Sequence, residues 1–217
     1  MRANLFALAA IGLWASLAAL GVALRHVPPF LLTGIALALG SVLAWPAVLR
    51  DQRQWRVAPR TLGLGVFTLF GYHFLLFIGF RLAPAVEVNL INYLWPLLIV
   101  VLAPMYLPGL KLRGIHIGAA VMGFTGAALA IWGAGADTKT LPGNASSVSG
   151  LGYLLALGSA FIWANYSLQT KRLELSGKGF PTAAIGLFGL LSGLLSLACH
   201  WLLEAPVSLS AHDWLLL

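Results

Sequence analysis

The fold is decided by two similar stretches, ALAAIGLWAS at residues 7–16 and ALGSAFIWAN at residues 156–165. They align on Trp14 and Trp163, which lie 149 positions apart. A period of this length is too long for a solenoid unit, so it indicates two half-proteins. Five apolar spans make up one period, and an odd number makes the second half enter the membrane from the opposite side. Such inverted repeats are typical of secondary transporters, which bind substrate where the halves meet.

The composition places nearly the whole chain in a lipid bilayer. Charged residues make up 9% of the 217 residues and hydrophobic residues 60%, whereas a soluble domain carries about 25% charge. The apolar runs are continuous and long enough for helices, unlike the short alternating strands of a barrel. We therefore predict an all-α, polytopic membrane bundle. Spans are expected near 4–24, 30–49, 61–82, 86–107, 113–132, 151–171 and 180–203, with an eighth that starts near Asp213.

The net charge of +7 is interpreted as a topology signal rather than as a nucleic-acid-binding surface. With a cytoplasmic N-terminus, ten basic residues lie on the inner side of the membrane and three lie outside, namely Arg25, Arg81 and Lys139. This positive-inside bias predicts a multi-pass protein whose N-terminus is cytoplasmic. A cleaved signal peptide is the alternative for residues 1–24, but the matching segment at residues 151–171 argues for a retained helix.

The chain is expected to divide at one long connection. Residues 1–132 form the first five-span repeat, residues 133–149 form a polar linker on the outside, and residues 150–217 begin the second, inverted repeat. Two copies of the period need about 298 residues and ten spans. This chain holds about seven and a half of those spans, so we expect the sequence to be a fragment.

Three tryptophans, Trp14, Trp95 and Trp163, are expected near the middle of their spans. Tryptophan in membrane proteins usually prefers the membrane–water boundary. We therefore expect these three side chains to wall a central cavity that accepts a flat apolar ligand. Packing against neighbouring helices is the alternative for each of them.

The span near 86–107 begins with the polar run EVNLINYLWP at residues 87–96. Asn89, Asn92 or Tyr93, and Pro96 follow helical spacing and share one face. We expect this face to point into the bundle or into a water-filled cavity, because amides in hydrocarbon need partners. Pro96 also removes a backbone hydrogen bond, which predicts a kink or a free carbonyl for a substrate amine near residue 92. Interhelical hydrogen bonding alone is the alternative.

The span near 151–171 carries the second polar face. Ser159, Trp163, Tyr166 or Ser167, and Thr170 recur at helical spacing, with Asn165 and Gln169 beside them. Small-residue pairs at Gly114 and Gly118 and at Gly189 and Gly193 are expected to allow close helix approach.

Two titratable residues are candidates for proton or cation coupling. His73 lies near the centre of its span and its reference pKa is close to neutral, although a hydrogen-bonded structural histidine is the favoured alternative. Glu87 lies at the outer end of the next span. We expect Glu87 to pair with Arg81 across the short turn, with recruitment of an ammonium group at the external mouth as the alternative.

Several function classes lack their sequence signals. A phosphate-binding loop is missing, which disfavours ATP as the driving force. There are no histidines or carboxylates with metal-ligand spacing, which disfavours a metal site. The sequence also lacks a converging Ser, His and Asp set, which disfavours an enzyme, and a selectivity-filter motif, which disfavours a channel. We expect neither a cofactor nor a catalytic residue, and the sequence predicts no oligomeric state.

Over all 217 residues the chain resembles the EamA-type exporters of the drug/metabolite transporter superfamily. The resemblance rests on Trp14, the turn FRLAPA at residues 80–85, Pro96 and the Trp-Ala pattern at Trp163. More specific are the strings VEV at residues 86–88, NYLWP at residues 92–96 and AFIWA at residues 160–164, the last followed by Tyr166.

This resemblance implies ten helices in two inverted halves, both termini in the cytoplasm, and export across a bacterial inner membrane. It also implies a large hydrophobic cavity at the centre of the bundle. By position, the residues that map to this cavity are Trp14, His73, Tyr93, Trp95, Trp163 and Tyr166.

The predicted function is export of aromatic amino acids and similar flat, amphipathic solutes by alternating access through a central aromatic-lined cavity. Asn89, Asn92 and the backbone freed near Pro96 are expected to satisfy the amino and carboxylate groups. Two alternatives remain open: a broad exporter of cationic drugs such as paraquat, held by cation–π contacts, and a structural membrane protein without transport activity.

Overall fold

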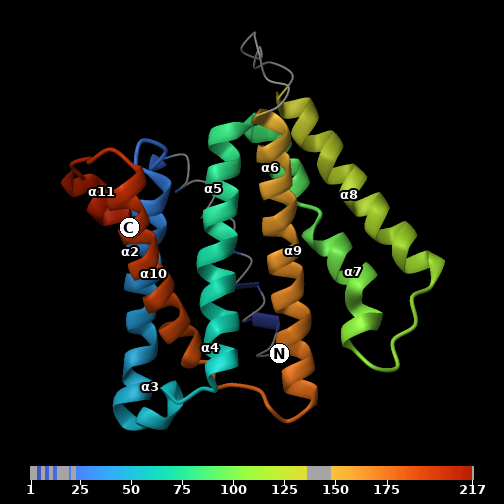
Figure 1. Ribbon diagram of the computed structural model, residues 1–217, viewed down its shortest axis with the longest axis horizontal. Coiled ribbons are helices and arrows are strands. Elements are labelled where there is room, and N and C mark those ends of the chain that lie inside the picture. Colours follow the sequence, from blue (N-terminus) through green and yellow to red (C-terminus); the bar gives the residue numbers. More distant parts are fainter. Residues whose placement is uncertain are drawn as a thin grey trace.

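The computed structural model describes residues 4–5, 8–9, 12–13, 20, 23–135 and 148–216 (Figure 1). Most of the predicted span near 4–24, including Trp14, lies outside these residues, as does most of the predicted linker. The regular structure of the described residues is entirely helical, which confirms the predicted all-α fold. Five helices are long and apolar enough to cross a membrane: Pro29–Arg50, Pro59–Leu82, Ala85–Tyr106, Ser149–Leu175 and Ala184–Leu203. Each matches a predicted span.

Three of these long helices contain an irregular turn. The first consists of α2 (Pro29–Ser41), the 3₁₀ turn η1 (Val42–Ala44) and α3 (Trp45–Arg50). The second consists of α4 (Pro59–Val66), the π-helical turn η3 (Phe67–Gly71) and α5 (Tyr72–Leu82). The third consists of α6 (Ala85–Asn92) and α7 (Trp95–Tyr106). The remaining helices are η2 (Gln52–Trp55), α8 (Gly114–Gly135), α9 (Val148–Leu175), α10 (Ala184–Leu203) and α11 (Ala211–Leu216).

Local sequence explains where these helices begin and end. Pro29 and Pro59 occupy the first helical position of α2 and α4, where a missing N–H costs nothing and the fixed φ suits a helix. α9 ends at Leu175 and is followed by Gly177, whose φ is +69°. There the N–H of Lys178 donates to Leu173 and that of Gly177 donates to Glu174, the hydrogen-bond pattern that closes a helix at a left-handed glycine.

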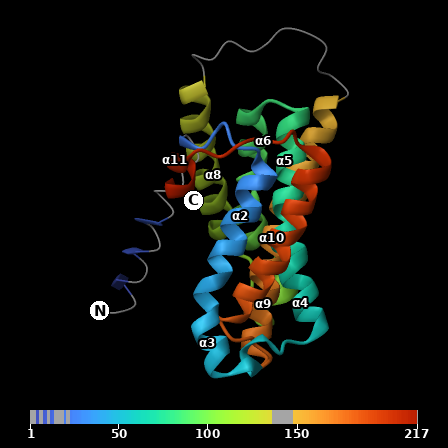
Figure 2. The ribbon, with the colours of Figure 1, turned by 90° about the vertical axis from the view of Figure 1, so that its left-hand side faces the viewer.

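α2 and α10 lie antiparallel in close contact along their length, as Figure 2 shows. Glycine makes this approach possible. A Cβ on Gly193 would lie 2.8 Å from the carbonyl oxygen of Gly34 and 2.9 Å from the nitrogen of Ala38. A Cβ on Gly189 would lie 3.3 Å from the carbonyl oxygen of Leu37. The predicted close approach at Gly189 and Gly193 is therefore confirmed, whereas the same prediction for Gly114 and Gly118 is wrong, since nothing in the described part of the chain lies within 4 Å of a Cβ at either position.

The long helices form two groups, one made by α2 and α10 and one in which α9 is the central helix (Figure 1). α9 packs on one side along α5 and on the other along α6 and α7, and α8 covers α7. At its start, Gly152 lets α9 approach the end of α5, because a Cβ there would lie 2.7 Å from that of Ala83. The connections α3–α4, α7–α8 and α9–α10, which carry most of the basic residues, all lie at the bottom of Figure 1. The opposite end is called the Glu204 end below, because α10 ends there at Glu204.

Candidate functional site

A hydrogen-bonded chain of side chains joins three helices in the middle of the bundle. Asn92 at the end of α6 donates from Nδ2 to the hydroxyl of Tyr72 on α5, at 3.0 Å. Ser159 on α9 donates to Oδ1 of Asn92, at 2.9 Å. Asn92 is 6% exposed and Ser159 is completely buried. In hydrocarbon such amides are stable only when their polar atoms have partners. Tyr72 and Ser159 are the partners of Asn92.

The hydroxyl groups of Ser159 and Tyr72 have hydrogen-bonding capacity left for a ligand. The hydroxyl of Ser159 also lies 2.7 Å from the carbonyl oxygen of Ala156, and its single proton serves only one of the two acceptors at a time. Tyr72 accepts from Asn92, so its own phenolic proton remains to be donated. We call Tyr72, Asn92 and Ser159 the central polar chain.

An aromatic stack adjoins the central polar chain. The ring of Trp163 lies 5.3 Å from that of Tyr72 and 6.2 Å from that of Tyr166, measured between centroids. His73 packs edge-on against Tyr72 at 5.0 Å and lies 5.7 Å from Phe77. The structure thus brings together Trp163, Tyr166 and His73 of the predicted site, and it adds Tyr72.

His73 has a hydrogen-bond partner on its own helix. Its Nδ1 lies 2.6 Å from the carbonyl oxygen of Leu69, and since a carbonyl only accepts, this nitrogen carries the proton. The contact falls beside the π-helical turn η3, where backbone carbonyls are displaced from the regular pattern. This geometry is the one expected of the structural alternative, and it fixes the tautomer of the imidazole.

The span that carries Asn89, Tyr93, Trp95 and Pro96 is interrupted, as the proline predicted. α6 ends at Asn92 and α7 starts at Trp95, with Pro96 in its first turn. Pro96 has no N–H to donate to the carbonyl of Asn92. The expected common polar face is divided by this break. Asn92 is buried, Asn89 and Trp95 are half-buried, and Tyr93 is 47% exposed.

Glu87 does not pair with Arg81, so the expected ion pair across the short turn is wrong. Arg81 instead contacts Glu204, with 2.9 Å between Nη2 and Oε1. Glu87 accepts a hydrogen bond from the hydroxyl of Tyr153 on α9. The physical reason is direction: the side chain of Arg81 extends from the last turn of α5 toward the end of α10, whereas Glu87 in the first turn of α6 points to α9.

A second polar contact, which the sequence did not predict as a site, joins α7 and α9. Asn165 donates from Nδ2 to the hydroxyl of Tyr106, at 2.8 Å, and Gln169 donates to Asn165 one turn further along. Asn165 and Gln169 were recognised as polar positions in a span, but their partner was not. Tyr106 stands at the end of an otherwise apolar helix, and an isolated tyrosine near a span end looks like an ordinary boundary residue.

An open hollow of about 370 Å³ lies at the other end of α10, between α2, α3 and Ala183. Its lining is almost entirely apolar, and it is remote from the central polar chain. The large central cavity therefore stays a prediction. Trp14, which was expected to wall this cavity together with Trp95 and Trp163, lies outside the described residues.

Comparison with known proteins identifies the family. The model of the EamA-like transporter family matches residues 1–132. The chain is 34% identical over 224 residues to the protein named aromatic amino acid exporter YddG of Ancylobacter novellus, across 98% of this chain and 72% of the relative. It is 30% identical over 178 residues to the protein of the same name from Salmonella typhimurium, across 79% of this chain and 59% of the relative.

The fold agrees with this assignment. A crystal structure of a protein that is 34% identical superposes with a TM-score of 0.84, and the superposition covers 99% of this chain and 72% of that one. The resemblance found in the residues around Trp95 and Trp163 is thus confirmed over nearly the whole chain. The chain is a multi-pass membrane protein, and it belongs to the EamA-like transporter family.

Proposed function

We propose that this protein is a secondary transporter that exports aromatic amino acids and similar flat, amphipathic solutes by alternating access. The observation that carries the proposal is the central polar chain beside the ring of Trp163. Polar side chains from α5, α6 and α9 meet there next to stacked aromatic rings. A zwitterion with an aromatic side chain needs this combination of hydrogen-bonding groups and apolar ring surface in one place.

The ring of the substrate is assigned to the aromatic stack. Tyr72, Trp163 and Tyr166 lie at centroid distances of 5.3 and 6.2 Å, a range in which tilted rings attract one another. When the phenyl or indole ring of a substrate packs here in place of one of these rings, the attraction between rings is kept and the substrate ring becomes buried. Tyr93, Trp95 and Trp14 are proposed as further walls of the same site.

The polar end of the substrate is assigned to the central polar chain and the break in the third span. The phenolic proton of Tyr72 is available to a carboxylate. The backbone carbonyl of Asn92 receives no hydrogen bond from Pro96, which has no N–H, so it is available to the ammonium group. Asn89 lies one turn earlier on α6 and is half-buried, so we propose it as an auxiliary polar contact.

A broad exporter of flat organic cations is the second candidate, and the same stack favours it. The faces of Trp163, Tyr72 and Tyr166 attract cations through their quadrupoles. The two candidates differ in the need for a carboxylate. Competition by a paraquat-like dication against phenylalanine efflux indicates the cation exporter, whereas competition by tryptophan and not by the dication indicates the amino acid exporter.

The proposed topology places the basic connections in the cytoplasm and the Glu204 end outside. The positive-inside rule supports this orientation, since the connections at Arg50–Arg60, Lys111–Arg113 and Lys171–Lys178 lie at the same end. The orientation is tested with single cysteines at the exposed Gln52 and Ala205 in a Cys199→Ser background. A membrane-impermeant thiol reagent applied to intact cells should label position 205 and not position 52. The reverse pattern contradicts the orientation.

The activity itself is tested by flux of labelled phenylalanine in proteoliposomes, with and without a pH gradient. Flux without a gradient that excess tryptophan blocks supports a facilitative aromatic exporter. Flux only with a gradient makes His73 and Glu87 the coupling candidates, and unchanged pH dependence in His73→Ala and Glu87→Gln removes them. Absence of flux under both conditions overturns the proposed substrate class.

A further inference from the structure

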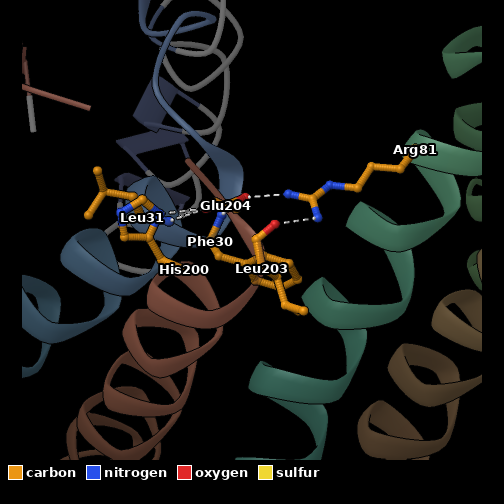
Figure 3. Close-up of polar contacts among 6 residues, drawn as sticks. All are labelled: Phe30, Leu31, Arg81, His200, Leu203 and Glu204. Atoms are coloured by element: carbon orange, nitrogen blue, oxygen red, sulfur yellow. Dashed lines mark hydrogen bonds and ion pairs between the residues drawn. The ribbon is translucent and has the colours of Figure 1, made fainter. Parts of the chain in front are cut away.

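The Glu204 end of the bundle is held by one buried carboxylate. Figure 3 shows the side chain of Glu204 between the start of α2, the end of α10 and the last turn of α5. Its Oε1 accepts from Nη2 of Arg81 at 2.9 Å and from the backbone N–H of Phe30 at 3.1 Å. Its Oε2 accepts from Nδ1 of His200 at 2.8 Å and from the backbone N–H of Leu31 at 3.3 Å. The side chain of Glu204 is only 2% exposed.

The contacts with the backbone replace a missing helix cap. α2 starts after Pro28, which has no side-chain oxygen, and the N–H groups of Phe30 and Leu31 have no partner within the helix. Glu204 satisfies both, and its negative charge suits the positive end of the helix dipole. Because His200 and Glu204 belong to the end of α10, these contacts unite α2 and α10 into one unit.

Arg81 is the part of this cluster that belongs to the other helix group. It stands in the last turn of α5, and its guanidinium also donates to the carbonyl oxygen of Leu203, at 3.3 Å. Its side chain is 39% exposed, and it lies over the ring of Phe30 at 5.7 Å. Glu204 retains three donors without Arg81, so this contact is the exchangeable one.

Aromatic rings also make contacts between α2 and α5 at this end. Phe30 is completely buried and lies 5.7 Å from Phe74 and 5.5 Å from Phe77. Ring contacts of this kind slide more readily than interlocked backbones. The boundary between the two helix groups at this end therefore includes an aromatic contact and one ion pair.

The span that contains α5 changes partner along its length. Its first part, α4, packs on α10, where a Cβ on Gly65 would overlap the ring of Phe188. Its second part, α5, packs on α9. The π-helical turn η3, Phe67–Gly71, lies at the change. A π turn is a local irregularity at which helices bend, so it provides a joint between the two groups.

We propose that Arg81 and Glu204 form a latch at the Glu204 end, which holds α5 against the α2–α10 unit and opens and closes as the two helix groups move. The turn η3 is the joint of this motion. The inference deepens the proposed transport function, because alternating access requires one end of the bundle to open while the other closes. Arg81 acts as a positioning residue, and no contact with the substrate is assigned to it.

The latch is tested by distances between spin labels on the purified protein in lipid. One label pair replaces the exposed Ala85 and Trp201 at the Glu204 end, and a second pair replaces the exposed Gln52 and Ser176 at the opposite end, both in a Cys199→Ser background. Arg81→Gln removes the ion pair and leaves the cap of α2 in place. We expect a new population at longer distance for the first pair and at shorter distance for the second.

Two further variants serve as controls. Lys171→Gln removes an exposed ion pair with Glu174 inside one helix, so it should leave the distances of the first label pair unchanged. Arg81→Lys keeps one charged donor for Glu204, and it should restore most of the wild-type distribution even if Arg81→Gln folds poorly. Wild-type distances in Arg81→Gln at both ends overturn the latch. Longer distances at the Glu204 end alone, with the second pair unchanged, also overturn it, because they indicate loosening without coupled motion.

These outcomes are independent of the substrate. If wild-type protein fails to transport phenylalanine but Arg81→Gln shifts both distance distributions, the latch stands and the substrate assignment fails. If phenylalanine is transported and the distributions do not shift, the substrate assignment stands and the latch fails.

Discussion

The interface between α2 and α10 and the interface between α9 and the α6–α7 span are built by different means. The first brings backbones into contact through Gly34, Gly189 and Gly193. The second is joined by side-chain hydrogen bonds at three levels of α9, from Tyr153, Ser159 and Asn165. Backbone contact fixes the distance between two helices, whereas a side-chain hydrogen bond can be exchanged for one to a ligand. We therefore expect α2 and α10 to behave as a rigid unit, and we propose that the surface of α9 adapts to a ligand.

The largest effect is expected where the backbones touch. Gly193→Ala puts a methyl group 2.8 Å from the carbonyl oxygen of Gly34, which forces the two helices apart, so we expect a loss of about 1–3 kcal/mol in stability. The measurement is the thermal unfolding midpoint in detergent. Gly63→Ala is the matched control, because nothing lies within 4 Å of a Cβ at that exposed helical position. An equal midpoint for both variants contradicts the rigid unit.

An intermediate effect on stability, with a large effect on transport, is expected at the central polar chain. Asn92→Leu removes the hydrogen bonds to Tyr72 and Ser159, and interhelical hydrogen bonds in membranes contribute about 0.6–2 kcal/mol each. Phenylalanine flux at equal protein density should be lost in Asn92→Leu and in the double variant with Asn89→Leu. Full flux in these variants contradicts a role of the central polar chain in binding. Absence of flux in the wild-type protein, together with neutral or raised stability of the double variant, supports the structural membrane protein instead.

The smallest effect is expected at the exposed contact between Tyr153 and Glu87. Tyr153→Phe removes a single hydroxyl donor whose acceptor is exposed to solvent, so the change in stability should be roughly 0.5 kcal/mol or less. The unfolding midpoint and the rate of phenylalanine flux should both stay near wild type. If Tyr153→Phe loses as much stability and flux as Asn92→Leu, the hydrogen bonds of Tyr153, Ser159 and Asn165 are equally important, and the central polar chain is not special among them.

Much of the fold follows from the sequence because membrane helices obey local rules. The long apolar runs predicted the spans to within a few residues, and Pro96 predicted the break between α6 and α7. The spacing of Gly189 and Gly193 predicted a close approach. Each of these features depends on residues within one helix, which is the information that a periodic pattern carries.

The sequence predicted few of the side-chain contacts between helices. Arg81 and Glu87 are six positions apart and of opposite charge, yet each pairs with a residue more than sixty positions away. Tyr72 and Tyr106 were not recognised, since a single tyrosine in an apolar span has no pattern. Their hydrogen bonds to Asn92 and Asn165 arise from the relative rotation of α5, α7 and α9, which one sequence does not encode in any local period.

We propose that the aromatic stack beside the central polar chain holds the substrate, and phenylalanine efflux from proteoliposomes containing Trp163→Ala is the decisive experiment. The matched control is Trp201→Ala on α10, where the side chain is 84% exposed. We expect Trp163→Ala to insert normally and lose transport, and Trp201→Ala to transport at the wild-type rate. Wild-type transport by correctly inserted Trp163→Ala would contradict this proposal.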